Sequence, residues 1–273
     1  MKLIIAIPSL AEAEKIIRFA EQIAVHADGP IHLLLVVDSK GRLSMTRAEE
    51  VINLAREVLG NQEIMARIQV GGTEKEIIQA LIEGNFDLMI LGEVPISYLS
   101  KMMHGIRTAR VVEGAPCPVI IVKGITRRIR RILLCDSGAG KSSILSRYTA
   151  QLAKTLEGEE EVIVLHVMSQ ICAGPGVPDR DLLASVDELI ELHTPEGEIL
   201  SQDMRVLTQP GIQPIPMVRH GLVVDEILDE ARSGDYDLIV IGAHQVKDWH
   251  RFLLEDFTRQ ILIHADRPVM VVT

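Results

Sequence analysis

The chain has 273 residues, 47% of them hydrophobic, and a formal net charge of −10 at pH 7. That charge excludes a generally basic nucleic-acid-binding protein and argues against attraction to an anionic membrane, because most of the surface would repel phosphate groups. No apolar stretch approaches the ~18–20 residues that cross a bilayer, and the five apolar residues from Leu3 are too few for the core of a secretory signal, so we expect no membrane insertion and a cytoplasmic protein.

The residue types that carry chemistry form no legible site. The cysteines Cys117, Cys135 and Cys172 lie far apart and lack metal-ligand spacing, so we interpret them as reduced thiols. His244 and His250 are six residues apart rather than the four that place two ligands on one helix face, so we predict no metal site. No serine, cysteine or carboxylate pair shows a catalytic spacing, and we expect no enzyme.

Short apolar runs alternate with helical patterns along the chain. In the first half the pattern predicts strands at 2–7, 31–37, 64–70, 87–91 and 118–123, and helices at 10–26, 45–59, 73–83 and 105–113. In the second half it predicts strands at 131–135, 162–167, 214–219, 237–241 and 268–272, and helices at 142–156, 179–193, 223–233 and 254–264. The strand runs are apolar on both faces, which indicates an α/β fold with a parallel sheet covered by helices on both sides.

The two halves of the sequence repeat each other. The segment GNFDLMILG at 84–92 matches GDYDLIVIG at 234–242, and APCPVIIV at 115–122 matches ADRPVMVV at 265–272, both at an offset of 150 residues. We therefore predict two copies of one domain, at 1–124 and 129–273. The basic residues at the junction, Arg127, Arg128, Arg130 and Arg131, are interpreted as a solvated linker.

At these repeated segments the sequence resembles the universal stress protein family in its tandem two-domain form. The resemblance implies that each domain is a five-stranded, mostly parallel open sheet of strand order 3-2-1-4-5 with helices on both faces. It also implies that the last strands, PVIIVK at 118–123 and PVMVVT at 268–273, pair with each other. The expected partners are therefore the two domains of this chain, as an intramolecular pseudo-dimer, and a second copy as a homodimer. The sequence identifies no protein partner.

Many members of that family bind ATP or AMP. The family pattern is an Asp closing the first strand, a Val ending the second, and G-x2-G-x9-G-[ST] after the fourth. In the second copy Asp136, Val167 and Gly242 match it, whereas Gln245 and Glu255 replace the later glycines and Asp256 replaces the hydroxyl residue. In the first copy Val37, Gly92 and Gly105 match it, whereas Pro8, Pro95 and Ile106 replace the Asp, the second glycine and the hydroxyl residue.

These departures weaken a phosphate site. A glycine-rich loop holds phosphate because its backbone N–H groups approach closely at a helix N-terminus. Glu255 and Asp256 would open the helix expected from residue 254, where they suit the helix dipole but repel a triphosphate. Pro95 removes a backbone donor in the first copy. We therefore expect degenerate nucleotide pockets in both copies.

The sequence DSGAGKSS at 136–143 superficially suggests a Walker A loop. The required first glycine would fall at Cys135, so the interpretation we favour is a turn with Ser142 or Ser143 capping the next helix. The alternative is an anion site at a helix N-terminus, with Gly138, Gly140, Lys141 and Ser142 as its ligands. His244, two residues after Gly242, is a further candidate contact.

Three functions stay open. The first is a non-catalytic stress-response binding and interaction protein that needs no cofactor. The second is an ATP- or AMP-binding switch or weak ATPase that uses one half-site: Val37, Gly92 and Gly105, or Asp136, Lys141, Val167 and Gly242. A third hypothesis is a regulator akin to the stress-protein-like domains attached to cation transporters.

Overall fold

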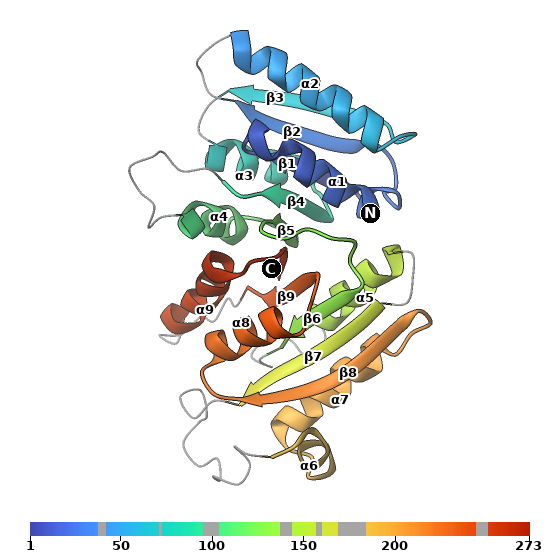
Figure 1. Ribbon diagram of the computed structural model, residues 1–273, viewed down its shortest axis with the longest axis vertical. Coiled ribbons are helices and arrows are strands. Elements are labelled where there is room, and N and C mark those ends of the chain that lie inside the picture. The colour runs from blue at the N-terminus through green and yellow to red at the C-terminus, as the bar shows by residue number, and fades with distance from the viewer. Residues whose placement is uncertain are drawn as a thin grey trace. The chain divides into compact units, whose positions relative to one another are not determined.

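The computed structural model describes residues 1–37, 42–70, 73–94, 104–136, 144–156, 160–168, 184–243 and 251–273, with side chains described outside 42–44, 104–106 and 251–256. The chain forms two compact units (Figure 1). Unit 1 holds Met1–Arg128, Arg267–Val271 and Thr273, and unit 2 holds Ile129–Asp266 and Val272.

Unit 1 is built on a parallel sheet of order β3-β2-β1-β4-β5. Its strands are β1 (Leu3–Ile7), β2 (Ile31–Val37), β3 (Ile64–Val70), β4 (Leu88–Gly92) and β5 (Val119–Val122). Its helices are η1 (Leu10–Glu12), α1 (Ala13–Ala24), α2 (Arg42–Val58), α3 (Thr73–Gly84) and α4 (His104–Glu113). The expected order 3-2-1-4-5 is therefore confirmed for the first copy.

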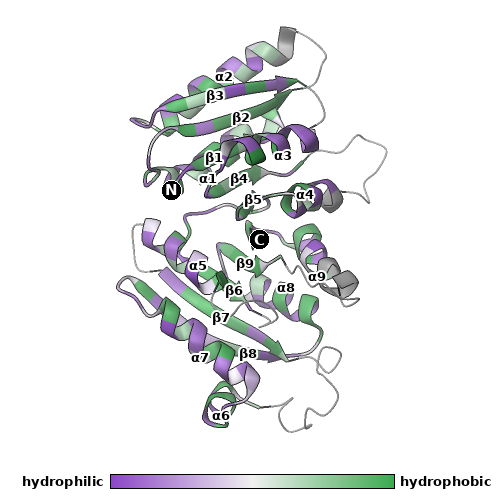
Figure 2. Ribbon diagram, turned by 180° about the vertical axis from the view of Figure 1, so that it is seen from behind, coloured by the Kyte–Doolittle hydropathy of each residue, from purple (hydrophilic) through white to green (hydrophobic). Residues whose placement is uncertain are grey.

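The central strands of unit 1 are buried along their whole length, as their unbroken apolar runs predict. Every residue of β1 and β4 is buried, and Figure 2 shows these strands as continuously hydrophobic. Helices α1 and α2 contact each other and the sheet, while α3 and α4 form a second pair. Helix α1 turns Ile16, Ala20 and Ile23 toward the sheet, and all three are fully buried.

The last strand of the chain completes unit 1. Residues of β10 (Val269–Val272) pair antiparallel with β5, with Met270 opposite Ile120. This is the pairing between 118–123 and 268–273 that the resemblance implies, and it is confirmed. It satisfies the outward backbone groups of β5, which would otherwise form an open sheet edge.

Unit 2 repeats the same plan. Its parallel strands run in the order β8-β7-β6-β9. The strands are β6 (Arg131–Cys135), β7 (Glu160–Met168), β8 (Ile212–His220) and β9 (Leu238–Gly242), and the helices are α5 (Ile144–Thr155), α6 (Val186–Glu191), α7 (Pro195–Leu207), α8 (Val223–Ser233) and α9 (Arg251–His264). Directly after β9, Ala243 N–H donates to Val272 O at 2.7 Å, so the end of β10 occupies the place of a fifth strand in unit 2.

Two expectations for unit 2 are wrong. The single helix expected at 179–193 is the six-residue α6 followed by a second helix, α7, which the hydrophobic pattern did not predict. Thr194 caps α7 by accepting a hydrogen bond from Gly197 N–H at 3.1 Å, and Pro195 occupies its first turn. Helix α9 begins at Arg251 rather than at residue 254, so Glu255 and Asp256 lie in its second turn. The favourable interaction with the helix dipole expected for them is confined to the first turn.

The outermost strands of the two units, β3 and β8, differ in their proline content. β3 contains no proline, whereas β8 carries Pro214 and Pro216, paired with Val162 and Val164 of β7. Residues two apart point their backbone nitrogens to the same side, and a proline in a sheet keeps that side outward. The outer side of β8 therefore lacks two donors.

Among the described residues, no helix has the length and apolar content to span a bilayer.

Candidate functional site

Asp136 stands directly after β6, at the carboxyl ends of the unit 2 strands. Its backbone N–H donates to Leu165 O of β7 at 3.3 Å, which holds the chain at the point where β6 ends. The residue is 6% exposed. Val167 lies near the end of β7 and Gly242 ends β9, so three sequence candidates stand at the carboxyl ends of three strands, β6, β7 and β9.

Two residues that the sequence analysis missed surround the Asp136 carboxyl group. Asp203 of α7 and Ser146 of α5 are both fully buried. The Asp203 carboxyl group interacts with the Asp136 carboxyl group and with the Ser146 hydroxyl. Burial first, and then the Asp136 charge, raise the pKa of Asp203 to about 7.

His166 of β7 fixes the backbone at the same point. Its Nδ1 lies 3.0 Å from the carbonyl oxygen of Asp136. A carbonyl can only accept a hydrogen bond, so Nδ1 carries the hydrogen. Burial lowers the pKa of His166, against smaller opposing contributions from Asp136 and Glu196, so the ring is neutral at pH 7.

The corresponding place in unit 1 is filled by the chain itself. Pro8 follows β1 and is buried. A Cβ atom added to Gly92 would lie 2.3 Å from Ile16 Cδ1 and 3.2 Å from Pro8 Cδ. The missing side chain of Gly92 therefore makes room for Ile16 and Pro8.

The helices that follow the fourth strands are held by matched threonines, Thr108 and Thr258. Val94 N–H donates to Thr108 Oγ1 at 3.2 Å, and Thr258 Oγ1 donates to Gly242 O at 3.2 Å. Val37 ends β2 and is buried, and Gly105 lies in the first turn of α4. Val37 and Gly92 thus lie at the carboxyl ends of β2 and β4, and Gly105 lies at the start of the helix that follows β4.

Several candidates lie outside the described residues: Gly138, Gly140, Lys141, Ser142, the alternative cap Ser143, Pro95, His244, Gln245 and Cys172. Among the cysteines that the structure describes, Cys117 is buried, and burial raises its pKa to about 11. Burial also raises the pKa of Cys135, so neither thiol is a ready nucleophile.

A hollow of about 150 Å³ lies at the opposite, amino-terminal ends of β1 to β3. Ile4, His32, Arg67, Ala80 and Phe86 are among the residues that line it. At an offset of 150 residues, Ala80 and Phe86 correspond to Glu230 and Tyr236.

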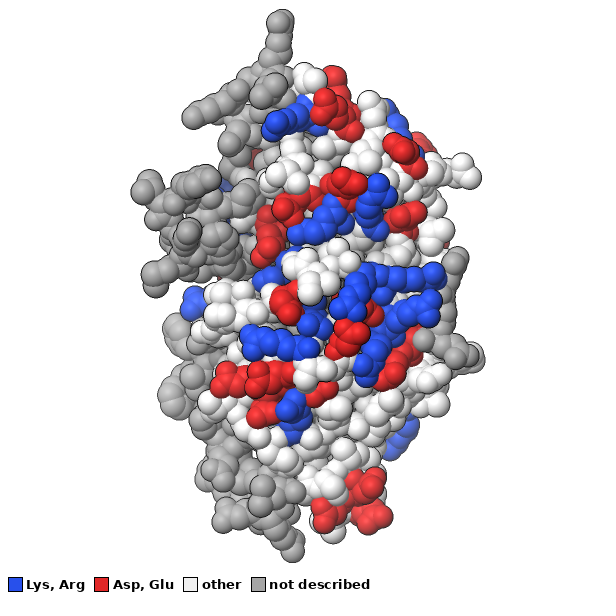
Figure 3. Space-filling view, viewed as in Figure 1, with Lys and Arg blue, Asp and Glu red and all other residues white. Residues whose placement is uncertain are grey.

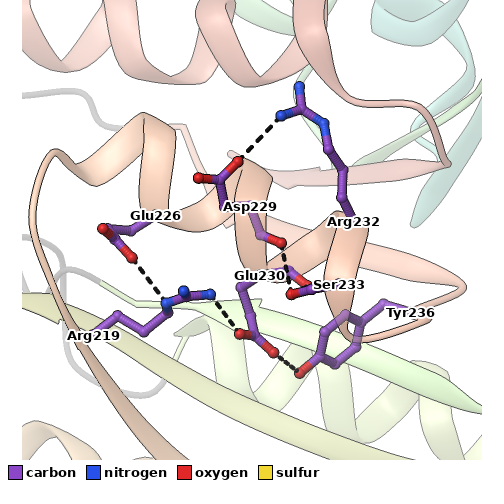
Figure 4. A network of polar contacts seen from close by, with 7 residues as sticks. All are labelled: Arg219, Glu226, Asp229, Glu230, Arg232, Ser233 and Tyr236. Carbon is purple, nitrogen blue, oxygen red and sulfur yellow. Dashed lines mark hydrogen bonds and ion pairs between the residues drawn. The ribbon is translucent and has the colours of Figure 1, made fainter.

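In unit 2, Glu230 and Tyr236 belong to a network of polar contacts (Figure 4). Tyr236 Oη donates to Glu230, and Arg219 bridges Glu230 and Glu226 at 2.7 and 2.8 Å. Two residues that line the hollow in unit 1 are therefore apolar where unit 2 has a hydrogen-bonded carboxylate and phenol.

Charged side chains of both signs occur on the face drawn in Figure 3, where several Lys and Arg side chains lie close together with Asp and Glu side chains among them. Within the described part of the chain, no group of three or more His, Cys, Asp or Glu side chains is placed to hold a metal ion.

Comparison with known proteins identifies the family. The model of the universal stress protein family matches residues 1–123 and again residues 128–273. The chain belongs to the universal stress protein family. Its duplicated match and the corresponding strand order of the two units make it a tandem member.

Individual relatives agree with that assignment. A Thermus aquaticus universal stress protein encoded in the QAH/OAS sulfhydrylase 3′ region is 28% identical over 42% of this chain and 86% of its own length. A universal stress protein from Archaeoglobus fulgidus has a similar structure, with a TM-score of 0.69 at 16% identity over 99% of this chain and 96% of that chain. The cytoplasmic domain of a prokaryotic cation chloride cotransporter shares the fold, with a TM-score of 0.53 at 12% identity over 99% of this chain and 94% of that chain.

Proposed function

We propose that this universal stress protein is a non-catalytic binding and interaction protein whose two nucleotide pockets are degenerate. In this proposal the domains 1–124 and 129–273 act as an intramolecular pseudo-dimer and take no ATP in the mode described for the family.

One observation carries the proposal. Gly92, the glycine that would let a phosphate approach in the first copy, is packed against Ile16 and Pro8 of its own unit. A glycine serves a phosphate site by leaving its backbone open to the ligand. Here the space over Gly92 is taken by apolar atoms, and Pro8 offers no carboxylate for a ribose hydroxyl.

A second candidate function, an ATP- or AMP-binding switch, rests on the second copy. Asp136 there keeps the position that the family resemblance gives to the adenosine-contacting carboxylate, directly after β6. Val167 and Gly242 stand at the ends of the neighbouring strands, so this half-site retains three of the required residues.

Calorimetric titration of the purified full chain with ATP, ADP and AMP separates the two functions. The proposal expects dissociation constants no tighter than about 1 mM, which corresponds to roughly −4 kcal/mol. It also expects no nucleotide in the supernatant of heat-denatured protein.

Micromolar binding that Asp136→Asn weakens tenfold or more would establish the switch instead. Asp187→Asn is the matched control, because Asp187 is an exposed carboxylate of α6 in the same unit. Micromolar binding that both variants leave unchanged would place the nucleotide outside the Asp136 half-site and would contradict the weak affinity that the proposal expects.

A further inference from the structure

We propose that Asp203 is a positioning residue for Asp136, and that the two buried carboxyl groups share one proton. The inference rests on the proposed function in a single respect, namely that Asp136 belongs to the candidate pocket of the second copy.

The first support is the burial of the group. Asp203 and Ser146 are fully buried and Asp136 is 6% exposed. No described N–H or O–H group donates a hydrogen bond to either Asp203 oxygen, and Ser146 Oγ has no hydrogen-bond partner among the described residues. A buried ionised carboxylate without full hydrogen bonding is costly, and it avoids the cost by taking up a proton.

The second support is the neighbourhood of Asp203. Asp136 faces it from the end of β6 and Ser146 faces it from α5. The other titratable groups around the pair are His166 of β7, a neutral ring bonded to the Asp136 carbonyl, and Glu196 in the first turn of α7. A carboxylate beside a second carboxylate has its ionisation disfavoured, and one proton between the two relieves the repulsion.

The third support is the way the elements bring the pair together. Helix α7 packs against β7, β8 and α5, and it carries Asp203 to the carboxyl end of the sheet. The Asp136 backbone is already held by Leu165 and His166. Asp203 then supplies a neutral donor to the Asp136 side chain, so the direction of that carboxylate depends on α7.

The shared proton gives a pH dependence of known sign. The pKa of Asp203 is raised in the folded chain to about 7, above its ordinary value of 3.8. The folded state therefore binds more protons than the unfolded state between these values, and stability falls as pH rises through that window. For one proton, the unfolding equilibrium constant rises at most tenfold per pH unit.

The test needs no nucleotide, so its outcome is separate from that of the proposed function. Carbon-13 NMR of Asp side-chain carboxyls follows the titration of Asp203 in the full chain, with Asp203→Asn used to assign the signal. We expect a midpoint near pH 7 that falls by at least one pH unit in Asp136→Asn, since that variant removes the neighbouring charge.

Denaturant unfolding between pH 5 and 7 gives the second readout. The wild-type unfolding constant should rise relative to that of Asp203→Asn, which keeps His166 and a neutral side chain of the same shape, whereas Asp187→Asn should follow the wild type. A wild-type midpoint near pH 4, or one that Asp136→Asn leaves unmoved, would overturn the proposal even if a variant failed to fold well enough for unfolding studies.

Discussion

The hydroxyl of Tyr236 donates a hydrogen bond to Glu230 Oε1 across 2.7 Å. The same two positions in the first copy hold Phe86 and Ala80, which have neither the donor nor the acceptor. Because one chain carries both versions of the site, each copy serves as a reference for the other.

Tyr236→Phe removes the donor and leaves Glu230, whose side chain is only 12% exposed, with Arg219 as its remaining partner. We expect a loss of ~1–2 kcal/mol in unfolding free energy, measured by denaturant titration. Phe86→Tyr is the matched control, because its new hydroxyl would face Ala80, and it should gain nothing. Equal stability of Tyr236→Phe and the wild type would show that the hydrogen bond contributes nothing to folding.

Gly92→Ala tests the closed space after β4. The new Cβ would meet Ile16 Cδ1 at 2.3 Å inside a packed core, so we expect a loss of ~1–3 kcal/mol. Ile16→Val removes that terminal methyl and alone should cost ~0.5–1.5 kcal/mol. The double variant should be more stable than the sum of the two losses predicts, and simple additivity would contradict the contact.

Gly197→Ala tests the junction between α6 and α7. A Cβ at this position would lie 2.0 Å from the backbone oxygen of Leu189, which cannot rotate away as a side chain would. We expect a loss of at least ~2 kcal/mol in unfolding free energy. Glu198→Ala, one residue further along α7, should cost far less. A fully stable Gly197→Ala would mean that the two helices pack less closely than the structure describes.

His166 should stay neutral with its hydrogen on Nδ1. Burial lowers its folded pKa below the ordinary 6.5, so it stabilises the fold above that pH, and the contribution is lost as pH falls. Long-range proton–nitrogen NMR should report the Nδ1–H tautomer and a midpoint below 6.5. An Nε2–H tautomer, or a midpoint above 6.5, would contradict the hydrogen bond to Asp136 O.

The repeated apolar runs predict most of the fold. Short runs such as LIIAI at Leu3–Ile7 are typical of strands buried on both faces, and the offset of 150 residues between the repeated segments predicts the second copy from the first. Helix α7 escaped this reasoning because PEGEILSQDMRVL mixes apolar residues with a glycine in its first turn. Its signal lies in the cap, since Thr194 followed by Pro195 and Glu196 is a typical helix start.

The candidate site also has one residue that the sequence indicated and one that it did not. Asp136 could be found from the sequence because it follows the first strand of the second copy, where the family resemblance implies an Asp. Asp203 could not, because a single aspartate between Gln202 and Met204 is indistinguishable from a solvated residue. Its burial depends on the packing of α7 onto β7 and α5, which is a tertiary contact that no local pattern encodes.

Pro214 and Pro216 have a consequence beyond the geometry of β8. A foreign strand laid along that border meets carbonyl groups but finds two gaps where amide hydrogens should be. Such a border is a poor template for fibril growth or for runaway stacking of chains. Pro214 and Pro216 thus disfavour the addition of further strands to the second copy, while the pairing of β8 with β7 is kept.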